Sequence, residues 1–227
     1  MIVFSFVSFL YIASLLFIQP APKSLKGSKL SFAKNFLAIR GSLFVGLFLI
    51  LIFLVTSNFK FLKISDGALV LLGLSNLKEL SILWPLQFFT HVIIHLDITH
   101  LVANLSGLAL ASLYERRVGT KRFLAVLAVS ALFSGFSILF YRDASVACGI
   151  SGGVFGLAVS YFIDSEEIQS KDLVQALLAF SMLFILYSFF GSSKLEFSGK
   201  VDQVGHVLGA IAGALYCRKV RKPVRRN

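Results

Sequence analysis

The sequence predicts an all-α, polytopic membrane protein with a six-helix core preceded by an extra N-terminal transmembrane helix. Of its 227 residues, 57% are hydrophobic and 15% are charged, whereas soluble domains have about 45–50% apolar and about 25% charged residues. Apolar segments close to the length that crosses a bilayer recur along the chain, which is typical of a helical membrane protein. Most of the 22 Lys and Arg residues lie in the connections on one membrane side of these segments, together with the C-terminal tail. Because basic residues gather on the inner side, the C-terminus is predicted to be cytoplasmic.

The first segment of the chain, residues 1–18, is almost wholly apolar, and no Lys or Arg precedes it. A secretory signal has a basic start and a small-residue cleavage site, so we expect an extra membrane helix here instead. Residues 19–40 carry several basic residues and no acidic one, which predicts a cytoplasmic loop. Residues 41–57 are expected to form the first helix of the core.

The next part of the chain combines a long connection with a histidine-bearing span. Residues 58–89 contain only short apolar pieces and are expected to lie in the membrane interface. Residues 90–114 are expected to form the second core helix, and we expect His91 and His95 to lie in the interface at its outer end. His100 and Asn104 are four residues apart and share a helix face. Polar groups at membrane depth indicate function.

The remaining core helices are predicted from four apolar segments. They span residues 123–141, 150–163, 173–190 and 201–216. The basic tail that follows is expected inside the cell. In this topology Cys148 and Cys217 lie at opposite membrane faces, too far apart for a disulfide.

A glycine-rich octapeptide, GISGGVFG at 149–156, places Ser151 at the start of one of these helices. One interpretation is a helix-packing face whose serine bonds to its own backbone. The other is a nucleophile, because the unpaired N–H groups at a helix start can hold an oxyanion. Gly152 and Gly156 form one small-residue face, and Gly205, Gly209 and Gly213 form another, so the two helices can approach closely.

Depth in the membrane separates these two interpretations. At 1.5 Å per residue, Ser151 lies about 18 Å above the inner face, His206 and Asn104 about 15 Å, and His100 about 21 Å. Four polar side chains from three helices therefore fall within about a turn of one another, inside a hydrocarbon core of about 30 Å. Glycine packing alone does not explain a histidine at the level of the serine.

The chemistry that this set allows is acyl transfer. His206 is the candidate base that takes the proton of Ser151 and returns it to the leaving amine. Asn104, His100 and the backbone N–H groups around the serine are candidate donors to the oxyanion. Asp202 would sit a turn above the histidine, so we interpret it as a loop residue and predict a serine–histidine dyad.

Short motifs carry a resemblance that covers residues 41–217. They are HLVAN at 100–104, ERRVG at 115–119 followed by Arg122 and Phe123, GISG at 149–152 and GHVLG at 205–209. Their order, spacing and membrane side resemble those of rhomboid intramembrane serine proteases. The GISG motif alone would be weak, since soluble hydrolases use similar strings. In this scheme residues 1–40 are the added segment and basic loop, and residues 218–227 are a cytoplasmic tail.

The resemblance implies a rhomboid-like six-helix core with a water-filled active site open to the outer side. It implies that Ser151 is the nucleophile and His206 the base, with Asn104 and His100 at the oxyanion. It implies transmembrane protein substrates within the lipid bilayer, cleaved in or beside their helix after a small residue, with no cofactor and no metal. The compact chain and its basic inner loops favour a prokaryotic plasma membrane.

The resemblance also implies structural roles for residues outside the chemistry. They are Gly149, Gly152, Gly209, Gly213 and Glu115, the last tying an inner loop together with Arg116 or Arg117. Many members carry Trp-Arg in the first outer loop, whereas here Trp84 is followed by Pro85. We also expect Phe155, one turn below the serine, to pack against the imidazole of His206.

Three other functions fit part of the sequence. A formal charge of +11 can indicate a nucleic-acid partner, but the positive-inside rule accounts for it, so no nucleic acid is expected. A transporter would place polar groups along a path through the membrane, and here one level holds nearly all of them. A catalytically inactive relative that binds membrane proteins remains the alternative, although both Ser151 and His206 are present.

Overall fold

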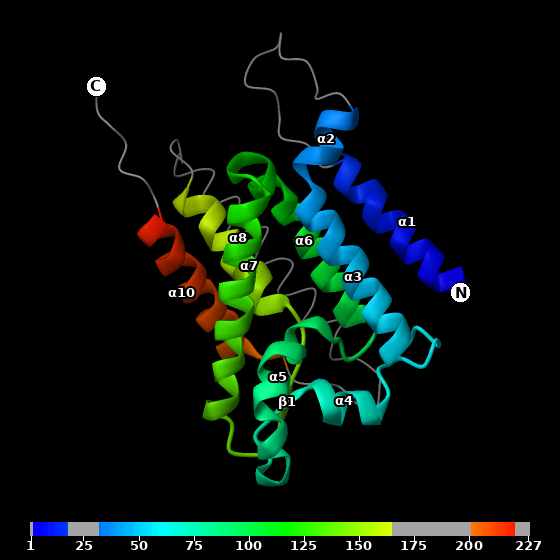
Figure 1. Ribbon diagram of the computed structural model, residues 1–227, viewed down its shortest axis with the longest axis vertical. Helices are drawn as coiled ribbons and strands as arrows, with labels where there is room; N and C mark the ends of the chain where they lie inside the picture. Colours follow the sequence, from blue (N-terminus) through cyan, green and yellow to red (C-terminus); the bar gives the residue numbers. More distant parts are fainter. Residues whose placement is uncertain (1, 18–31, 165–200, 221–227) are drawn as a thin grey trace.

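A computed structural model of the chain describes residues 2–17, 32–164 and 201–220 (Figure 1). These residues are largely helical. The helix predicted over 173–190 lies outside the described residues, as do residues 19–31 of the predicted inner loop. The six-helix core therefore stays a prediction.

The N-terminal helix α1, Ile2–Phe17, packs against α3, Arg40–Thr56, and α6. The Tyr11 hydroxyl donates to the Ser42 carbonyl oxygen at 2.6 Å, and the Tyr11 ring lies against Gly46, where a Cβ would overlap it. The chain after α1 returns through a short helix, α2, Phe32–Ala38, inside the segment predicted to be a loop. A helix exists where the extra N-terminal helix is expected, while its crossing of a membrane stays a prediction.

The connection after α3 has secondary structure of its own, and its place in the membrane interface stays a prediction. It contains α4, Asp66–Leu72, the two-residue strand β1, Leu74–Ser75, a 3-10 turn η1, Lys78–Leu83, and α5, Trp84–Thr90. Strand β1 pairs antiparallel with β2, Val146–Ala147, so the expectation of a wholly helical chain is corrected by one short pairing. The indole of Trp84 donates to the Ser75 carbonyl oxygen at 2.6 Å, which fastens α5 beneath this pair.

Helix α6, Ile98–Val118, begins eight residues later than the span predicted from residue 90. The carboxylate of Asp97 accepts the backbone N–H of His100 at 2.8 Å, and this N-cap fixes where the helix starts. The residues before it form a 3-10 turn, η2, His91–Ile93, and a short loop. Apolar periodicity did not reveal this boundary because Leu96 and Ile98, on either side of Asp97, are both apolar.

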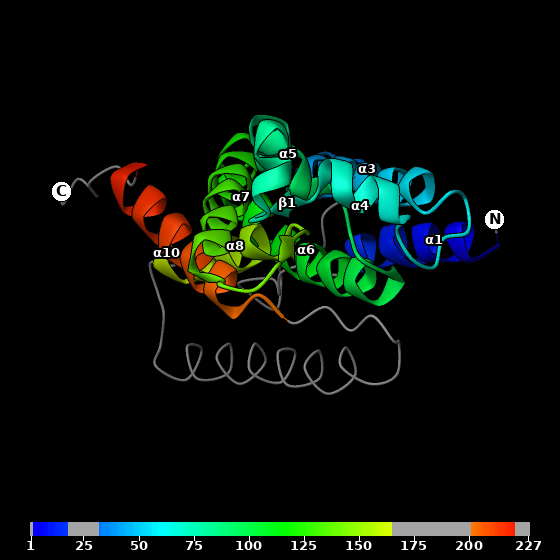
Figure 2. The ribbon, with the colours of Figure 1, turned by 90° about the horizontal axis from the view of Figure 1, so that it is seen from below.

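Three further helices complete the described part of the chain. They are α7, Thr120–Ser134, which continues as the 3-10 turn η3, Gly135–Phe140, then α8, Ser151–Ile163, and α10, Gln203–Val220. Figure 2 shows α8 and α10 on one side of α6, with α1 and α3 on the other. In the part of the chain that the structure describes, one helical stretch, Thr120–Phe140, is long and apolar enough to cross a membrane.

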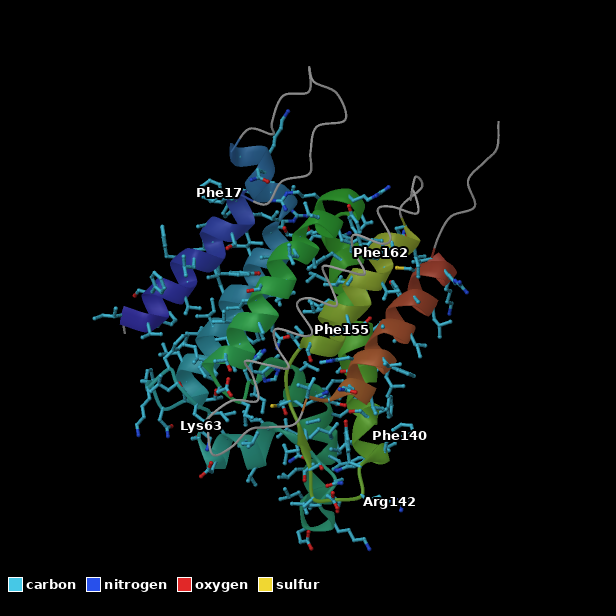
Figure 3. All side chains as sticks on the ribbon, turned by 180° about the vertical axis from the view of Figure 1, so that it is seen from behind. Phe17, Lys63, Phe140, Arg142, Phe155 and Phe162 are labelled. Atoms are coloured by element: carbon cyan, nitrogen blue, oxygen red, sulfur yellow. The ribbon has the colours of Figure 1, made fainter. Side chains whose placement is uncertain are left out.

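The labelled residues in Figure 3 distinguish the two ends of the packed helices. Phe17 and Phe162 lie toward one end, and Lys63 and Arg142 lie toward the other, with Phe155 between them. The end near Lys63 and Arg142 is the one predicted to face outward, and it also holds α4, α5 and the short strand pair. Both the start of α8 and the start of α10 point to this end.

Helices α8 and α10 meet along their small-residue faces, as expected. A Cβ at Gly209 would meet the backbone of Gly152, and a Cβ at Gly213 would lie 2.6 Å from the carbonyl oxygen of Gly156. The neighbours are backbone atoms, which cannot rotate away as a side chain can. Glycine is therefore required where the two helices cross.

At the inner end, the buried carboxylate of Glu115 joins α6 to the start of α3. Its Oε1 accepts from the Gly41 N–H and the Thr120 hydroxyl, both at 2.7 Å. Its Oε2 accepts from the Ser42 N–H at 2.8 Å and the Ser42 hydroxyl at 2.6 Å. Glu115 is fully buried, and a negative charge at a helix start is favourable.

Replacing Glu115 with glutamine is expected to lower the free energy of unfolding by about 3 kcal/mol, because an NH2 group then faces two donors in a buried site. Thermal unfolding in detergent micelles measures the effect. Lys121→Gln, at an exposed position of the neighbouring helix, is the control and should leave stability unchanged. Equal stability of Glu115→Gln and the native chain would show that the buried carboxylate does not hold the two helices together.

Candidate active site

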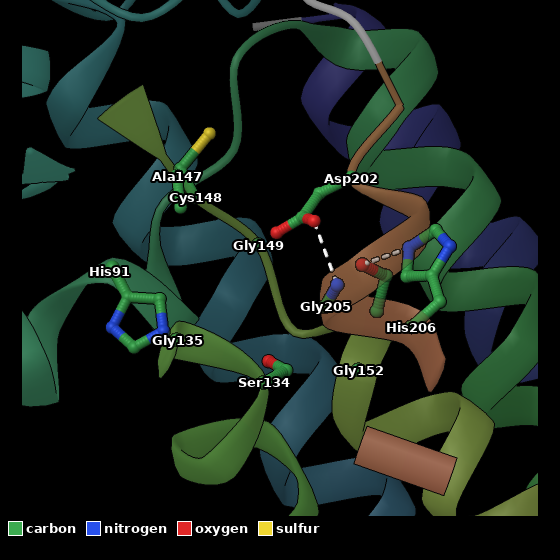
Figure 4. Close-up of a pocket in the computed structure, with 11 residues that line it drawn as sticks. His91, Ser134, Gly135, Ala147, Cys148, Gly149, Gly152, Asp202, Gly205 and His206 are labelled. Carbon is green, nitrogen blue, oxygen red and sulfur yellow. Dashed lines mark hydrogen bonds between the residues drawn. The ribbon is translucent and has the colours of Figure 1, made fainter. Parts of the chain in front are cut away.

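The structure brings Ser151 and His206 together at the end of the α8–α10 contact that is predicted to face outward. Ser151 is the first residue of α8, and His206 lies in the first turn of α10. The Ser151 hydroxyl and the Nε2 atom of His206 are 2.8 Å apart (Figure 4). This is hydrogen-bond distance for a hydroxyl and an imidazole nitrogen. A nucleophile and a base at this separation can pass a proton.

The imidazole of His206 is held by an aromatic ring rather than by an acid. Phe155, one turn below Ser151, stacks on it with ring centroids 4.2 Å apart and an interplanar angle of 12°, which confirms the predicted contact. Among the described residues, the Nδ1 atom of His206 has no hydrogen-bond partner. The geometry is therefore that of a two-residue pair, with the ring fixed by packing.

The start of α8 surrounds the serine with backbone donors. The first N–H groups of a helix have no acceptor within the helix, and Ser151 and Gly152 occupy those positions. Gly149 precedes them with a positive φ of 106°. A Cβ there would lie 2.6 Å from the ring of His100 and 3.5 Å from Nδ2 of Asn104. The left-handed backbone and the close ring both require glycine.

Asn104 and His100 lie beside this turn, on α6. Asn104 is buried, and its Nδ2 donor has no hydrogen-bond partner among the described residues. A buried donor without an acceptor is costly in a folded protein and demands an explanation. Its place next to the backbone of Gly149, two residues before the serine, suits a donor to an incoming oxyanion.

His91 and His95 lie inside the protein, and their expected place in the membrane interface stays a prediction. Both are buried in the protein, His91 at 2% and His95 at 0% exposure. The Gly149 N–H donates to the His91 carbonyl oxygen at 2.8 Å, and the His95 ring lies edge-on to His100, with centroids 5.1 Å apart. The His91 ring also lies against Gly135 of η3, and the positions of the two histidines in the sequence did not reveal these contacts.

Asp202 and Ser134 line the same pocket, together with His91 and Gly135, although neither was predicted as a site residue. Asp202 is a loop residue, as expected, directly before α10, and its carboxylate accepts the Gly205 N–H at 2.7 Å (Figure 4). An aspartate three residues before that glycine is a helix N-cap signature. That signal was present in the sequence.

Cys148 also borders the pocket, and its thiol is a possible competing nucleophile. Burial, followed by the negative charge of Asp97, raises the pKa of Cys148 to about 12. A thiol is nucleophilic only as the thiolate, so at neutral pH this cysteine stays protonated. Ser151 is the group in the pocket that has a base within reach.

Comparison with known proteins gives consistent matches. A family model described as the rhomboid domain matches residues 83–223. A protein named rhomboid protease GlpG from Yersinia enterocolitica is 30% identical over 132 residues, which cover 57% of this chain and 46% of that protein. Proteins of the same name from Yersinia pestis and Yersinia pseudotuberculosis are 29% identical over the same length. The chain thus spans about half the length of these curated relatives.

Proposed function

Because the chain belongs to the rhomboid family, we propose that it is an intramembrane serine endopeptidase that cleaves membrane-anchored proteins in or beside their transmembrane helix. The observation that supports this best is the 2.8 Å separation of Ser151 Oγ and His206 Nε2 at the start of two closely packed helices. The relatives it matches are named as proteases.

In the proposed reaction, Ser151 Oγ attacks the carbonyl carbon of the scissile peptide while His206 Nε2 takes the hydroxyl proton. The carbonyl oxygen becomes an oxyanion, which the backbone N–H groups at the start of α8, Nδ2 of Asn104 and His100 stabilise. Collapse of this intermediate breaks the C–N bond, and His206 gives the proton to the leaving amine. Water then hydrolyses the acyl-enzyme by the same steps, with His206 again as base.

The position of the pair supports a site that opens outward. Both residues lie at the helix ends that face the segment with α4, α5 and the short strands. We propose a multi-pass protein in a prokaryotic plasma membrane, with residues 41–217 as the protease core and residues 218–227 as a cytoplasmic tail. Residues 1–40 are an added segment whose helix docks on this core. Its substrates are transmembrane proteins that reach the site within the bilayer.

A fluorophosphonate probe tests the proposal, because it reacts only with an activated serine. We expect it to label the full chain in liposomes, and mass spectrometry of the labelled peptide should place it on Ser151. Cleavage of a single-span reporter in the same liposomes should give a cut in or beside the reporter's helix. Label on another serine would contradict Ser151 as the nucleophile, and a well-folded chain that neither labels nor cleaves would favour a binding protein without protease activity.

Asn104→Ala is expected to lower the rate of reporter cleavage by about 10²–10³-fold, the usual cost of one oxyanion donor. The substitution removes a buried amide whose Nδ2 makes no hydrogen bond among the described residues, so stability should change little. Initial cleavage rates in liposomes give the effect. Val102→Ala, on the exposed side of α6, is the control. An unchanged rate in Asn104→Ala would remove this residue from the oxyanion site.

A further inference from the structure

The carboxylate of Asp202 connects the start of α10 to the end of η3. Its Oδ1 accepts the Tyr141 hydroxyl at 2.7 Å and the Gly205 N–H at 2.7 Å. Its Oδ2 accepts the hydroxyl of Ser137, which is fully buried in η3. We call Asp202, Ser137 and Tyr141 the outer clamp. Both carboxylate oxygens are occupied by groups other than the imidazole.

These contacts exclude a direct part for Asp202 as a third member of a catalytic triad. Such an acid accepts the Nδ1–H of the histidine, and Nδ1 of His206 has no partner among the described residues. Asp202 instead bonds to the backbone of α10, because its carbonyl oxygen accepts the His206 N–H at 3.1 Å. It therefore holds the first turn of α10, and that turn carries the imidazole.

The segment that contains Ser137 also contacts α8 beside Ser151. Ser134 ends α7 and lies directly against Gly152, the residue after Ser151, where a Cβ would overlap it. Ser137 follows Ser134 after one helical turn of the continuous stretch Thr120–Phe140. One rigid segment thus contacts α8 beside the serine and, through the clamp, α10 beside the histidine.

We propose that Asp202 is a positioning residue: through the outer clamp it fixes the first turn of α10 against η3 and so sets the distance between His206 and Ser151. The role in catalysis rests on the proposed function, whereas the positioning itself does not. Hydrogen bonds to an ionised carboxylate are the stronger kind, and the buried Ser137 makes this one specific. Displacement of about 1 Å at a reacting pair can lower a rate by about 10²-fold.

Two variants separate positioning from helix capping. The double variant Ser137→Ala/Tyr141→Phe removes both hydroxyls and leaves the bond from Gly205 to Asp202 in place. Asp202→Asn keeps a side chain that caps a helix as well as aspartate does, but it replaces an acceptor oxygen with a donor NH2. Asp143→Asn is the matched control, because Asp143 is an exposed acid in the loop just after Tyr141.

The first measurement follows the imidazole without depending on activity. The chain has four histidines, so NMR of the full chain with isotope-labelled histidine gives few ring signals, and the signal lost in His206→Ala identifies His206. Because that ring stacks on Phe155, its chemical shift responds to small movements. Both clamp variants should shift the His206 signal and leave that of His95 in place, and Asp143→Asn should shift neither.

The second measurement is the rate of labelling by the fluorophosphonate probe. We expect the maximal inactivation rate to fall about 10-fold or more in the clamp variants, while the probe concentration for half-maximal rate stays constant. An unmoved His206 signal with a labelling rate within about twofold of native would overturn the proposal, even if the melting temperature fell. A moved signal in a chain whose native form takes no label would support the positioning and refute the protease function.

Discussion

Replacing His206 with alanine is expected to abolish both fluorophosphonate labelling and reporter cleavage, and Ser151→Ala is expected to do the same. A serine hydroxyl is a weak nucleophile until a base removes its proton. In this site, His206 Nε2 is the base within reach of Ser151, at 2.8 Å. Loss of either member of such a pair lowers the rate by a factor of about 10⁴ or more. Initial rates in liposomes measure the loss.

Two controls make this result specific to the pair. Ser106→Ala removes an exposed serine of α6 that bonds to its own helix, and it should leave activity unchanged. Thermal unfolding should show both alanine variants of the pair to be folded, since each removes few packing atoms. Retained labelling in a folded His206→Ala chain would end the proposal of a serine–histidine dyad.

Gly209→Leu is expected to give the largest combined loss of folding and activity. A Cβ at this position would overlap the backbone of Gly152, and the leucine side chain beyond it has no space between the helices. Helix α10 must then move away from α8, which separates His206 from Ser151. Overpacking of this kind costs about 3 kcal/mol or more. Thermal unfolding and labelling rate, measured on the same preparation, give the two effects.

The chain offers a matched glycine for comparison. Gly67, in α4, has open space where a Cβ would be, so Gly67→Leu makes the same chemical change without a clash. It should keep both stability and labelling. Gly209→Ala, which adds only the overlapping Cβ, should fall between the native chain and Gly209→Leu. Native stability and activity in Gly209→Leu would contradict the close contact of α8 and α10.

The sequence identified the parts of the site that follow from helical periodicity. Two small-residue faces predicted that α8 and α10 meet, and a phenylalanine one turn below Ser151 predicted the stack on His206. The structure confirms both contacts. These predictions succeeded because residues on one face of a regular helix have fixed relative positions. The catalytic roles of Ser151 and His206 remain predictions.

The sequence was less informative where the chain is irregular. His91 and His95 are buried against η3 and α6, and contacts of this kind follow from tertiary structure rather than from local periodicity. Ser137 and Tyr141 lie 65 and 61 residues before Asp202 in the sequence. No spacing rule connects them. The capping role of Asp202 could be predicted from the sequence, because Gly205 follows it at the three-residue spacing between an N-cap residue and the backbone N–H that it binds.

The docking of α1 has a consequence for the order of biosynthesis. The Tyr11 hydroxyl bonds to Ser42, 31 residues later in the chain, and the Leu15 carbonyl oxygen accepts from Arg116, 101 residues later. When α1 is synthesised, neither partner has been made. Helix α1 is thus made long before it can reach its final contacts, which form only after α6 has been synthesised.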